Sequence, residues 1–497
     1  MIKAKLVCRH SRGCKWITNS RGMDHDVLRR AAIEKEVSRY LESTLTLSLA
    51  LKAASKFSQG AECREGKGSV LRTTSLKGTF NICFWVQVEG LDVQWVVRFP
   101  ILGKLPHSAQ LAKLDSEVAT MKFLQQKTSV RVPRLIGFGL RDDDVGVPFI
   151  ITENLRAMPL QFYWNIHGKK PENAERVLKS LAQQYLSLLS HPFDRIGSLR
   201  LTQDHSSWEI GSGPLSADQY DMSHDRVTIQ ISPPMSSSLD YYRSQSQLWE
   251  RRMKEQRNSV YDEEDALQKY VTAEVFRRIV PFYASAQFTH GPFFLCHLDL
   301  HFANIFINHK HEVEAILDWE FSAILPIEVA SAPPPYFVKH DVDQLKIGSE
   351  HYQTFASRLE IFTKHVQASL HSTLSPILSN EACQCIQDRL NGAIDKRYAY
   401  FAWASSDARK MFAIVWDHFA LSTPLRLDRD ETTSDFLRIS DERDGELFDT
   451  EQQVVDAVIE RRSPLEVKAW VTERLTELEI YREERKRAGL DKVIPKN

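Results

Sequence analysis

The chain has 497 residues, of which 42% are hydrophobic and 26% are charged, and its formal net charge is −1. This composition is typical of a globular protein with a large core, and the near-zero charge gives no indication of a nucleic-acid partner. No apolar run approaches the roughly 18 residues of a membrane-spanning helix, and seven cysteines without paired spacing favour reduced thiols in an intracellular compartment.

The first 23 residues are basic, and no acidic residue occurs before Asp24. An acid-free start that carries arginine has the composition of a mitochondrial presequence, although a basic tail without structure would have it too. The apolar core of a secretory signal is missing. We therefore expect a cytoplasmic protein, with mitochondrial import as the alternative. Residues 24–54 follow as a predicted helical stretch without Pro or Gly.

A small β-rich region is predicted next. Its first three strands are expected over 70–74, 80–88 and 93–99, with a turn at 75–79 between the first two. The run 111–126 predicts an amphipathic helix, whose apolar face is formed by Leu114, Val118, Met121 and Leu124. Two more strands are expected over 135–138 and 148–152, and the second one ends at Glu153.

The rest of the chain is predicted to be mainly helical. Residues 174–189 and 262–283 have helical periodicity, and helices dominate from about 344 onward. Residues 197–240 are rich in Ser, Gly, Asp and Pro and predict a long irregular insertion. The last helix is marked by Ser463 as N-cap, Pro464 at its first position and Gly489 past its end.

The most informative segment is residues 291–320, GPFFLCHLDLHFANIFINHKHEVEAILDWE. Residues 305–308 and 313–317 predict the two arms of a short hairpin, which brings Asn304 and Asp318 together at its open end. An amide oxygen beside a carboxylate suits Mg²⁺ that also holds phosphates. Asp299, five residues before Asn304, would lie beside them as a base for an attacking hydroxyl. The segment therefore predicts a phosphoryl-transfer site.

Two other interpretations of this segment are weaker. Asp299 could cap a turn and Asn304 could simply begin a strand, but three polar groups at one end of an apolar hairpin are poorly explained that way. His297, Asp299 and His301 could also bind zinc, yet the His-Glu-x-x-His helix of a zincin is absent and the segment predicts a loop that leads into a strand.

The His-x-Asp-x-x-x-x-Asn run at 297–304 with Asp318 downstream resembles the catalytic loop and metal-binding segment of kinases. The words HLDLHFAN and LDWEF resemble the aminoglycoside phosphotransferase family and its choline-kinase-like relatives, and the style of the chain is similar to fungal members. The resemblance covers about residues 66–345. It implies that Asp299 is the catalytic base, that Asn304 and Asp318 are Mg²⁺ ligands, and that His297 braces the loop. Glu320 is a weaker candidate for a second metal ion.

The resemblance also assigns residues of the smaller lobe to ATP. Arg98 occupies the position of the phosphate-binding lysine of kinases, with Glu117 as its expected partner. A strand arginine paired with a surface acid is the alternative. The turn residues Lys77, Gly78 and Thr79 would lie over the phosphates. Glu153 would end the strand that leads into the hinge, where backbone groups bind adenine.

Together these features predict a bilobal, protein-kinase-like α+β fold with a small β-rich N-terminal lobe and a larger helical C-terminal lobe. The predicted divisions are a basic tail and helical extension at 1–65, a nucleotide-binding lobe at 66–155 and a catalytic and substrate-binding lobe at 156–490. The predicted function is transfer of the γ-phosphoryl group of ATP, assisted by Mg²⁺, to a hydroxyl of a small molecule. The alternative is a pseudokinase that keeps the fold and acts as a binding or scaffold protein.

Overall fold

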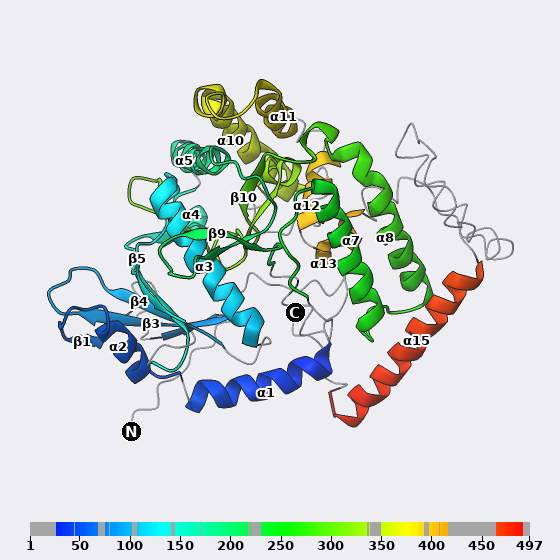
Figure 1. Ribbon diagram of the computed structural model, residues 1–497, viewed down its shortest axis with the longest axis horizontal. Coiled ribbons are helices and arrows are strands. Elements are labelled where there is room, and N and C mark those ends of the chain that lie inside the picture. Colours follow the sequence, from blue (N-terminus) through cyan, green and yellow to red (C-terminus); the bar gives the residue numbers. More distant parts are fainter. Residues whose placement is uncertain are drawn as a thin grey trace.

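The computed structural model describes residues 26–43, 45–67, 75–78, 80–101, 107–140, 145–168, 170–216, 219, 230–334, 337, 349–391, 397–406, 408–415 and 464–490. In Figure 1 a twisted sheet with its helices occupies the lower left, and a larger, mainly helical part lies above and to the right of it. The expected α+β class, with a small β-rich lobe and a larger helical lobe, is confirmed. The basic residues 1–23 lie outside the described residues.

The smaller lobe is built on one antiparallel sheet. Its strands are β1 (Cys63–Glu65), β2 (Ser75–Lys77), β3 (Asn81–Val88), β4 (Trp95–Pro100), β5 (Leu135–Gly139) and β6 (Phe149–Glu153). The strand order is β1-β3-β4-β6-β5, and β2 also pairs with β3. β1 thus belongs to this sheet although it precedes residue 66. Along β3 buried and half-buried residues alternate, so one face of the strand packs into the core and the other carries Asn81.

Three helices accompany this sheet, namely α1 (Val27–Ser43), α2 (Leu47–Ser55) and α3 (His107–Lys127). The single helical stretch predicted over 24–54 is divided, because Thr46 caps α2 by accepting a hydrogen bond from the N–H of Leu49. Buried side chains of α1 and α2 share one core with the sheet; they are Val37, Leu41, Ala50, Ala53 and Ala54. The N-terminal helices therefore pack on the sheet of the smaller lobe.

The larger lobe contains most of the helices. They are α4 (Leu160–Ile166), α5 (Pro171–Leu189), α7 (Ser238–Glu255), α8 (Glu263–Tyr283), the 3₁₀ turn η1 (Ala286–Phe288), α9 (Ile327–Ala330), α10 (Glu350–Leu374), α11 (Asn380–Asn391), α12 (Arg397–Ser406), α13 (Ala408–Val415) and α15 (Pro464–Arg487). Within the described ranges, no helix is both long enough and apolar enough to span a membrane.

Short strands complete this lobe. They are β7 (Met158–Pro159), β8 (Ser198–Leu201), β9 (Trp208–Ser212), β10 (Phe293–His297), β11 (Ile305–Ile307), β12 (Val313–Ile316) and β13 (Ser322–Pro326). β10 pairs with β13, and β11 lies between β12 and β7. These two small sheets hold the predicted site segment, since residues 298–304 join β10 to β11 and residues 317–321 join β12 to β13.

The irregular insertion predicted over 197–240 is corrected by the structure. It contains the hairpin of β8 and β9, and α7 begins at its end. The hairpin is ordered by contacts with distant residues. The Ser198 hydroxyl donates to the backbone oxygen of Ser322, and the Leu201 N–H donates to the Asp115 carboxylate. Hydrogen bonds to such distant residues cannot be predicted from the local sequence of a Ser- and Gly-rich stretch.

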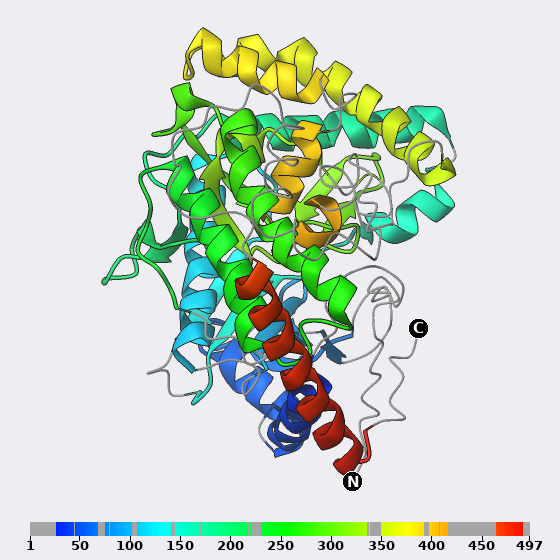
Figure 2. The same cartoon turned by 90° about the vertical axis from the view of Figure 1, so that its right-hand side faces the viewer.

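The long helix α15 packs against α8 and reaches α1, as Figures 1 and 2 show from two directions. The ring of Trp470 lies 5.2 Å from that of Tyr270, centroid to centroid, and Arg257 forms an ion pair with Glu484 at 2.7 Å. At its far end the Tyr481 hydroxyl accepts a hydrogen bond of 2.8 Å from the N–H of Val27. This helix therefore joins both lobes.

Candidate active site

The predicted hairpin is present, and its open end carries the two candidate metal ligands. Ile305 pairs with Ile316, and the N–H of Leu317 donates to the backbone oxygen of Asn304 at 2.8 Å. Asn304 is therefore opposite Leu317, and Asp318 follows directly. Asp318 has a φ of 66°, a left-handed conformation that turns the chain sharply at this point.

His297 braces the loop from the end of β10. Its Nε2 donates to the backbone oxygen of Leu317 at 2.9 Å, and its Nδ1 accepts from the N–H of Asp299 at 3.2 Å. Its ring also lies 4.7 Å from the ring of Trp319, centroid to centroid. Burial lowers the pKa of His297 to about 4, so the ring is neutral at pH 7 and can donate with one nitrogen and accept with the other.

The side chain of Asn304 has a fixed orientation. Its amide nitrogen donates to the backbone oxygen of Asp299 at 3.0 Å, and the side chain is buried. Because the nitrogen is used as this donor, Oδ1 is the atom that can meet a cation. The same hydrogen bond holds the two ends of the loop from Asp299 to Asn304 together.

Arg98 bridges two carboxylates of the site. It forms an ion pair with Glu117 on α3, as expected, and its Nη1 donates to Oδ1 of Asp318 at 3.1 Å. Burial raises the pKa of Glu117, and Arg98 opposes that shift. Burial and the neighbouring Glu320 raise the pKa of Asp318 well above its usual range, again against the effect of Arg98. Arg98 thus favours the charged form of both acids, against the effect of burial.

A second buried ion pair lies next to the first and was missed by the sequence interpretation. The Nζ of Lys113 is 2.5 Å from Oε2 of Glu320, and Nδ2 of Asn81 donates to the same oxygen at 2.9 Å. A signal for Lys113 does exist in the sequence, because it lies one helical turn before Glu117. Asn81, 239 positions from Glu320, has no local signal.

The predicted phosphate turn is only partly where it was expected. The turn predicted over 75–79 is wrong for residues 75–77, which form β2, with Lys77 paired to Ile82. The N–H of Gly78 donates to the backbone oxygen of Asn81 at 2.8 Å and so closes the hairpin instead of pointing to a ligand. Thr79 and the strand predicted over 70–74 lie outside the described residues.

Glu153 ends β6, away from the charged cluster. Its carboxylate accepts from the N–H of Arg134 at 3.2 Å, and its own N–H donates to the backbone oxygen of Arg134 at 3.1 Å. The next residue, Asn154, accepts from the indole N–H of Trp85 and donates its backbone N–H to the oxygen of Gln94. These contacts fix the strand end that leads to the larger lobe.

The donor set fits Mg²⁺ better than zinc. Asn304 and Asp318 offer hard oxygen atoms, which suit Mg²⁺ when phosphate oxygens and water complete its shell. In the parts of the chain that the structure describes, no group of three or more His, Cys, Asp and Glu is placed to hold a metal ion by itself. The exposed His301 accepts from the N–H of Ala303 instead.

A surface groove lies elsewhere in the molecule. It has a volume of about 630 Å³ and runs along β5, between Phe57 in the turn after α2 and Lys122 of α3, and it contains none of the predicted site residues. The candidate site is defined by the charged cluster and not by this groove.

Comparison with known sequences supports the family resemblance. Residues 81–328 match the model of the phosphotransferase enzyme family. The chain is 32% identical over 118 residues to "Altered inheritance of mitochondria protein 9, mitochondrial" of Meyerozyma guilliermondii, a match that covers 23% of this chain and 19% of that protein. The chain thus spans about a fifth of the length of this relative. It is 26% identical over 255 residues to "Clavilactone A biosynthesis cluster protein Y" of Ampulloclitocybe clavipes, covering 48% of this chain and 56% of that one.

Two solved structures are also similar. The ethanolamine kinase of Plasmodium vivax has a TM-score of 0.37 at 12% identity and covers 82% of this chain and 80% of its own. The GDP complex of wild-type aminoglycoside 2'-phosphotransferase-IIIa has a TM-score of 0.33 at 15% identity, covering 68% and 91%. The family match includes strands β3 to β6 of the small sheet, α3, the loop that joins β10 to β11, and the hairpin of β11 and β12. The chain belongs to the phosphotransferase enzyme family.

Proposed function

We propose that the chain transfers the γ-phosphoryl group of ATP to a hydroxyl of a small molecule, with Mg²⁺ bound at the open end of the β11–β12 hairpin. The observation that supports this most is the meeting of three chain segments at Asp318. It lies across the hairpin end from Asn304, and it is bound by Arg98 from β4. A cation, two oxygen ligands and a nearby Asp299 are the parts that phosphoryl transfer requires.

Each residue has a proposed role. Asp299 would orient the acceptor hydroxyl and take its proton, and His297 would hold the loop that carries Asp299. Asn304 and Asp318 would hold Mg²⁺, which when bound supplies charge to offset the phosphate oxygens. Arg98 would bind phosphate oxygens through its remaining guanidinium N–H groups while Glu117 keeps it in place.

The other predicted nucleotide-site residues, Lys77, Thr79 and Glu153, have smaller proposed roles. Lys77 is a cation at the end of β2 beside the hairpin that Gly78 closes, and it would reach phosphate with its side chain. Thr79 keeps its predicted role as a turn residue. Glu153 would act only by fixing, through Arg134, the strand end that leads to the adenine-binding connection.

The pseudokinase alternative is favoured by one specific observation. Arg98 replaces the lysine of kinases, and it is bound to both Glu117 and Asp318, so that a nucleotide must compete with Asp318 for its N–H groups. Against this alternative, Asp299, Asn304 and Asp318 are all present and lie on one loop and hairpin. We therefore propose the enzyme.

The test is the binding of ATP, measured by calorimetry with and without Mg²⁺. We expect binding in the micromolar range that needs Mg²⁺ and that is weakened at least tenfold by Asp318→Ala. Glu314→Ala is the matched control, because Glu314 is an exposed acid on β12 of the same hairpin. If the unmodified chain binds no ATP with Mg²⁺ or another divalent ion, the proposed mechanism is wrong.

The division into lobes and the cellular location are also proposals. We propose the boundaries 65/66 and 155/156 for the nucleotide-binding lobe, with β1 as a strand donated by the preceding segment.

The relatives named as mitochondrial proteins support the mitochondrial alternative over the cytoplasm. An import assay with isolated mitochondria tests it, and full protease sensitivity of the added chain would contradict it.

A further inference from the structure

The ion pair of Lys113 and Glu320 is the most deeply buried part of the charged cluster. The exposed fractions of the two side chains are 3% and 2%, against 16% for Arg98 and 31% for Asp318. Oε2 of Glu320 lies 2.5 Å from Nζ of Lys113 and accepts a hydrogen bond of 2.9 Å from Nδ2 of Asn81. Glu320 is therefore a fixed carboxylate whose charge is matched from within the protein.

Aromatic rings complete the surroundings of Lys113. Its Nζ lies 4.7 Å from the ring centroid of Phe80 and 5.1 Å from that of Phe321. These two rings contact each other edge to face, with centroids 5.2 Å apart. An ammonium between two rings and a carboxylate is held by directional contacts on several sides, so its position is well defined.

This ion pair joins three segments of the chain at the turn that carries Asp318. Lys113 comes from α3 and Asn81 from β3, both in the smaller lobe, while Glu320 and Phe321 follow the hairpin. The turn is also held from the other side, because the N–H of Leu298 donates to the backbone oxygen of Phe321 at 2.8 Å. Asp318 thus lies two residues before a fixed point, in a backbone conformation that is costly to keep.

We propose that Lys113 is a positioning residue for phosphoryl transfer, which acts through Glu320 to fix the turn that presents Asp318 to the metal ion. In this arrangement Glu320 is a brace and not a metal ligand. Its Oε2 already accepts from both Lys113 and Asn81, and its side chain is only 2% exposed. The inference rests on the proposed function, since it assigns Mg²⁺ to Asp318.

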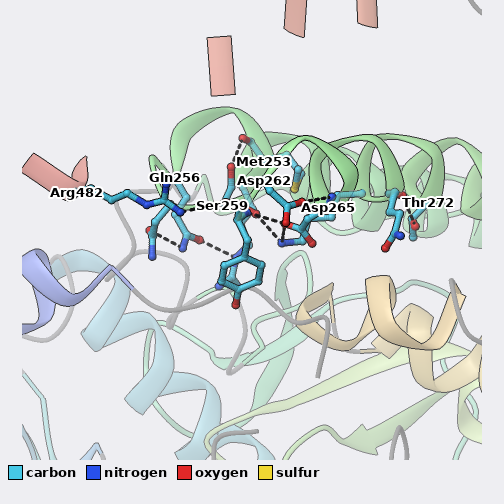
Figure 3. A network of polar contacts seen from close by, with 12 residues as sticks. Met253, Gln256, Ser259, Asp262, Asp265, Thr272 and Arg482 are labelled. Carbon is cyan, nitrogen blue, oxygen red and sulfur yellow. Dashed lines mark hydrogen bonds and ion pairs between the residues drawn. The ribbon is translucent and has the colours of Figure 1, made fainter. Parts of the chain in front are cut away.

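The chain contains a matched control for this role. Lys269 of α8 is also fully buried, forms an ion pair of 2.8 Å with Asp265, and lies 4.7 Å from the ring centroid of Tyr261. Its Nζ donates to the backbone oxygen of Ser259 and to the carboxylate of Asp265, two residues that are labelled in the polar network of Figure 3. This network lies where α7 meets α8 and contains none of the site residues.

The experiment compares Lys113→Met, Glu320→Gln and Lys269→Met with the unmodified chain. Three quantities are measured for each protein. They are the melting temperature, the affinity for ATP without metal, and the Mg²⁺ concentration that gives half-maximal ATP binding. Both lysine variants should melt at lower temperature, because each leaves a buried carboxylate without its cation. Of the two lysine variants, only Lys113→Met should raise the Mg²⁺ requirement, by about tenfold or more. Glu320→Gln, which removes the counter-charge of Lys113 but keeps an acceptor oxygen, should raise that requirement no more than Lys113→Met does.

Two results would overturn the proposal. If Lys113→Met lowers the melting temperature but keeps the Mg²⁺ requirement of the unmodified chain, Lys113 is only structural. If Glu320→Gln weakens Mg²⁺-dependent binding as much as Asp318→Ala does, Glu320 is a metal ligand.

A second measurement separates this proposal from the proposed function. Hydrogen exchange without nucleotide should show the amides of residues 317–321 exchanging about tenfold faster in Lys113→Met and unchanged in Lys269→Met. If the unmodified chain binds no ATP, the proposed function fails, and this exchange result still decides whether Lys113 fixes the turn. Unchanged exchange at residues 317–321 in Lys113→Met would refute that role.

Discussion

Arg98 and Asp318 are 220 positions apart in the chain, and Nη1 of the arginine donates to Oδ1 of the aspartate at 3.1 Å. Arg98 also forms an ion pair with Glu117, so one guanidinium neutralises an acid of α3 and an acid of the hairpin turn. The planar guanidinium has five N–H donors spread around it and can bind both carboxylates at once. The ammonium of a lysine presents three donors from a single nitrogen and is less suited to bridging two carboxylates. The arginine thus ties the nucleotide lobe to the candidate metal site.

Replacement of Arg98 by methionine is expected to destabilise the protein by about 3–5 kcal/mol, because two poorly exposed carboxylates then lack their shared cation. Urea unfolding at pH 7 measures this change in the free energy of unfolding. The control is Arg200→Met, which breaks an ion pair with Glu209 whose side chains are 56% and 50% exposed. That variant should lose less than about 1 kcal/mol. Equal losses in the two variants would show that Arg98 is not a buried bridge.

Replacement of Asp299 by asparagine should reduce phosphoryl transfer by about 100- to 10,000-fold, because the acceptor hydroxyl loses its base. The affinity for ATP should stay within about twofold, since Asp299 is not a proposed ligand of the nucleotide. Transfer from γ-labelled ATP to a panel of hydroxylated acceptors measures the first quantity and calorimetry the second. Asp240→Asn, at an exposed position of α7, is the control. Transfer that survives Asp299→Asn would contradict the assignment of the base.

His297 should make the stability of the protein depend on pH below neutrality. Its pKa is about 4 in the folded protein and near the ordinary value of 6.5 when unfolded, because burial disfavours the charged ring. Between these values the unfolded chain binds more protons, so the free energy of unfolding falls as the pH is lowered from 6.5 towards 4. In His297→Asn this fall should be smaller.

The measurement for His297 is urea unfolding at pH 7.0 and 5.0 in both proteins (about two pH units apart, within the titration range of histidine). His309→Asn is the control, since His309 is an exposed histidine in the turn of the same hairpin. An equal loss of stability on acidification in His297→Asn and the unmodified chain would show that the ring is not buried in its neutral form.

Tyr481 should contribute to stability through its hydroxyl. The side chain is buried, and the hydroxyl accepts a hydrogen bond from the N–H of Val27 at the start of α1. Tyr481→Phe keeps the ring and removes this acceptor, so we expect a loss of about 1 kcal/mol in the free energy of unfolding. Tyr398→Phe, at a position 39% exposed, is the control. Hydrogen exchange of α1 should also become faster in Tyr481→Phe only, and unchanged exchange would mean that α15 does not hold α1.

Local sequence was sufficient for the parts of the site whose geometry follows from spacing. The two arms predicted over 305–308 and 313–317 are nearly equal in length, so they were expected to bring Asn304 and Asp318 together at the open end of the hairpin. In the structure Asn304 lies opposite Leu317, and Asp318 follows directly. The periodicity of 111–126 predicted α3, and with it the face on which Glu117 meets Arg98. These predictions depend only on the regular spacing of residues along helices and strands.

The errors lie where a contact from another part of the chain decides the local structure. Residues 75–77 were expected in a turn but pair with β3, and the predicted irregular stretch after 197 forms a hairpin that Asp115 and Ser322 hold in place. A helix over 24–54 was expected to be continuous, but it is divided by the cap at Thr46. Propensity alone does not decide such cases, because tertiary hydrogen bonds outweigh it.

The sequence by itself thus determined the loop from His297 to Asn304, the hairpin that follows it and the α+β class, because each depends on residues close together in the chain. Only the tertiary structure decided that Arg98 binds Asp318, that Lys113 binds Glu320, and that α15 reaches α1. These contacts join residues more than 200 positions apart. Their partners are selected when the two lobes pack and exclude water from the charges between them, which no local spacing encodes.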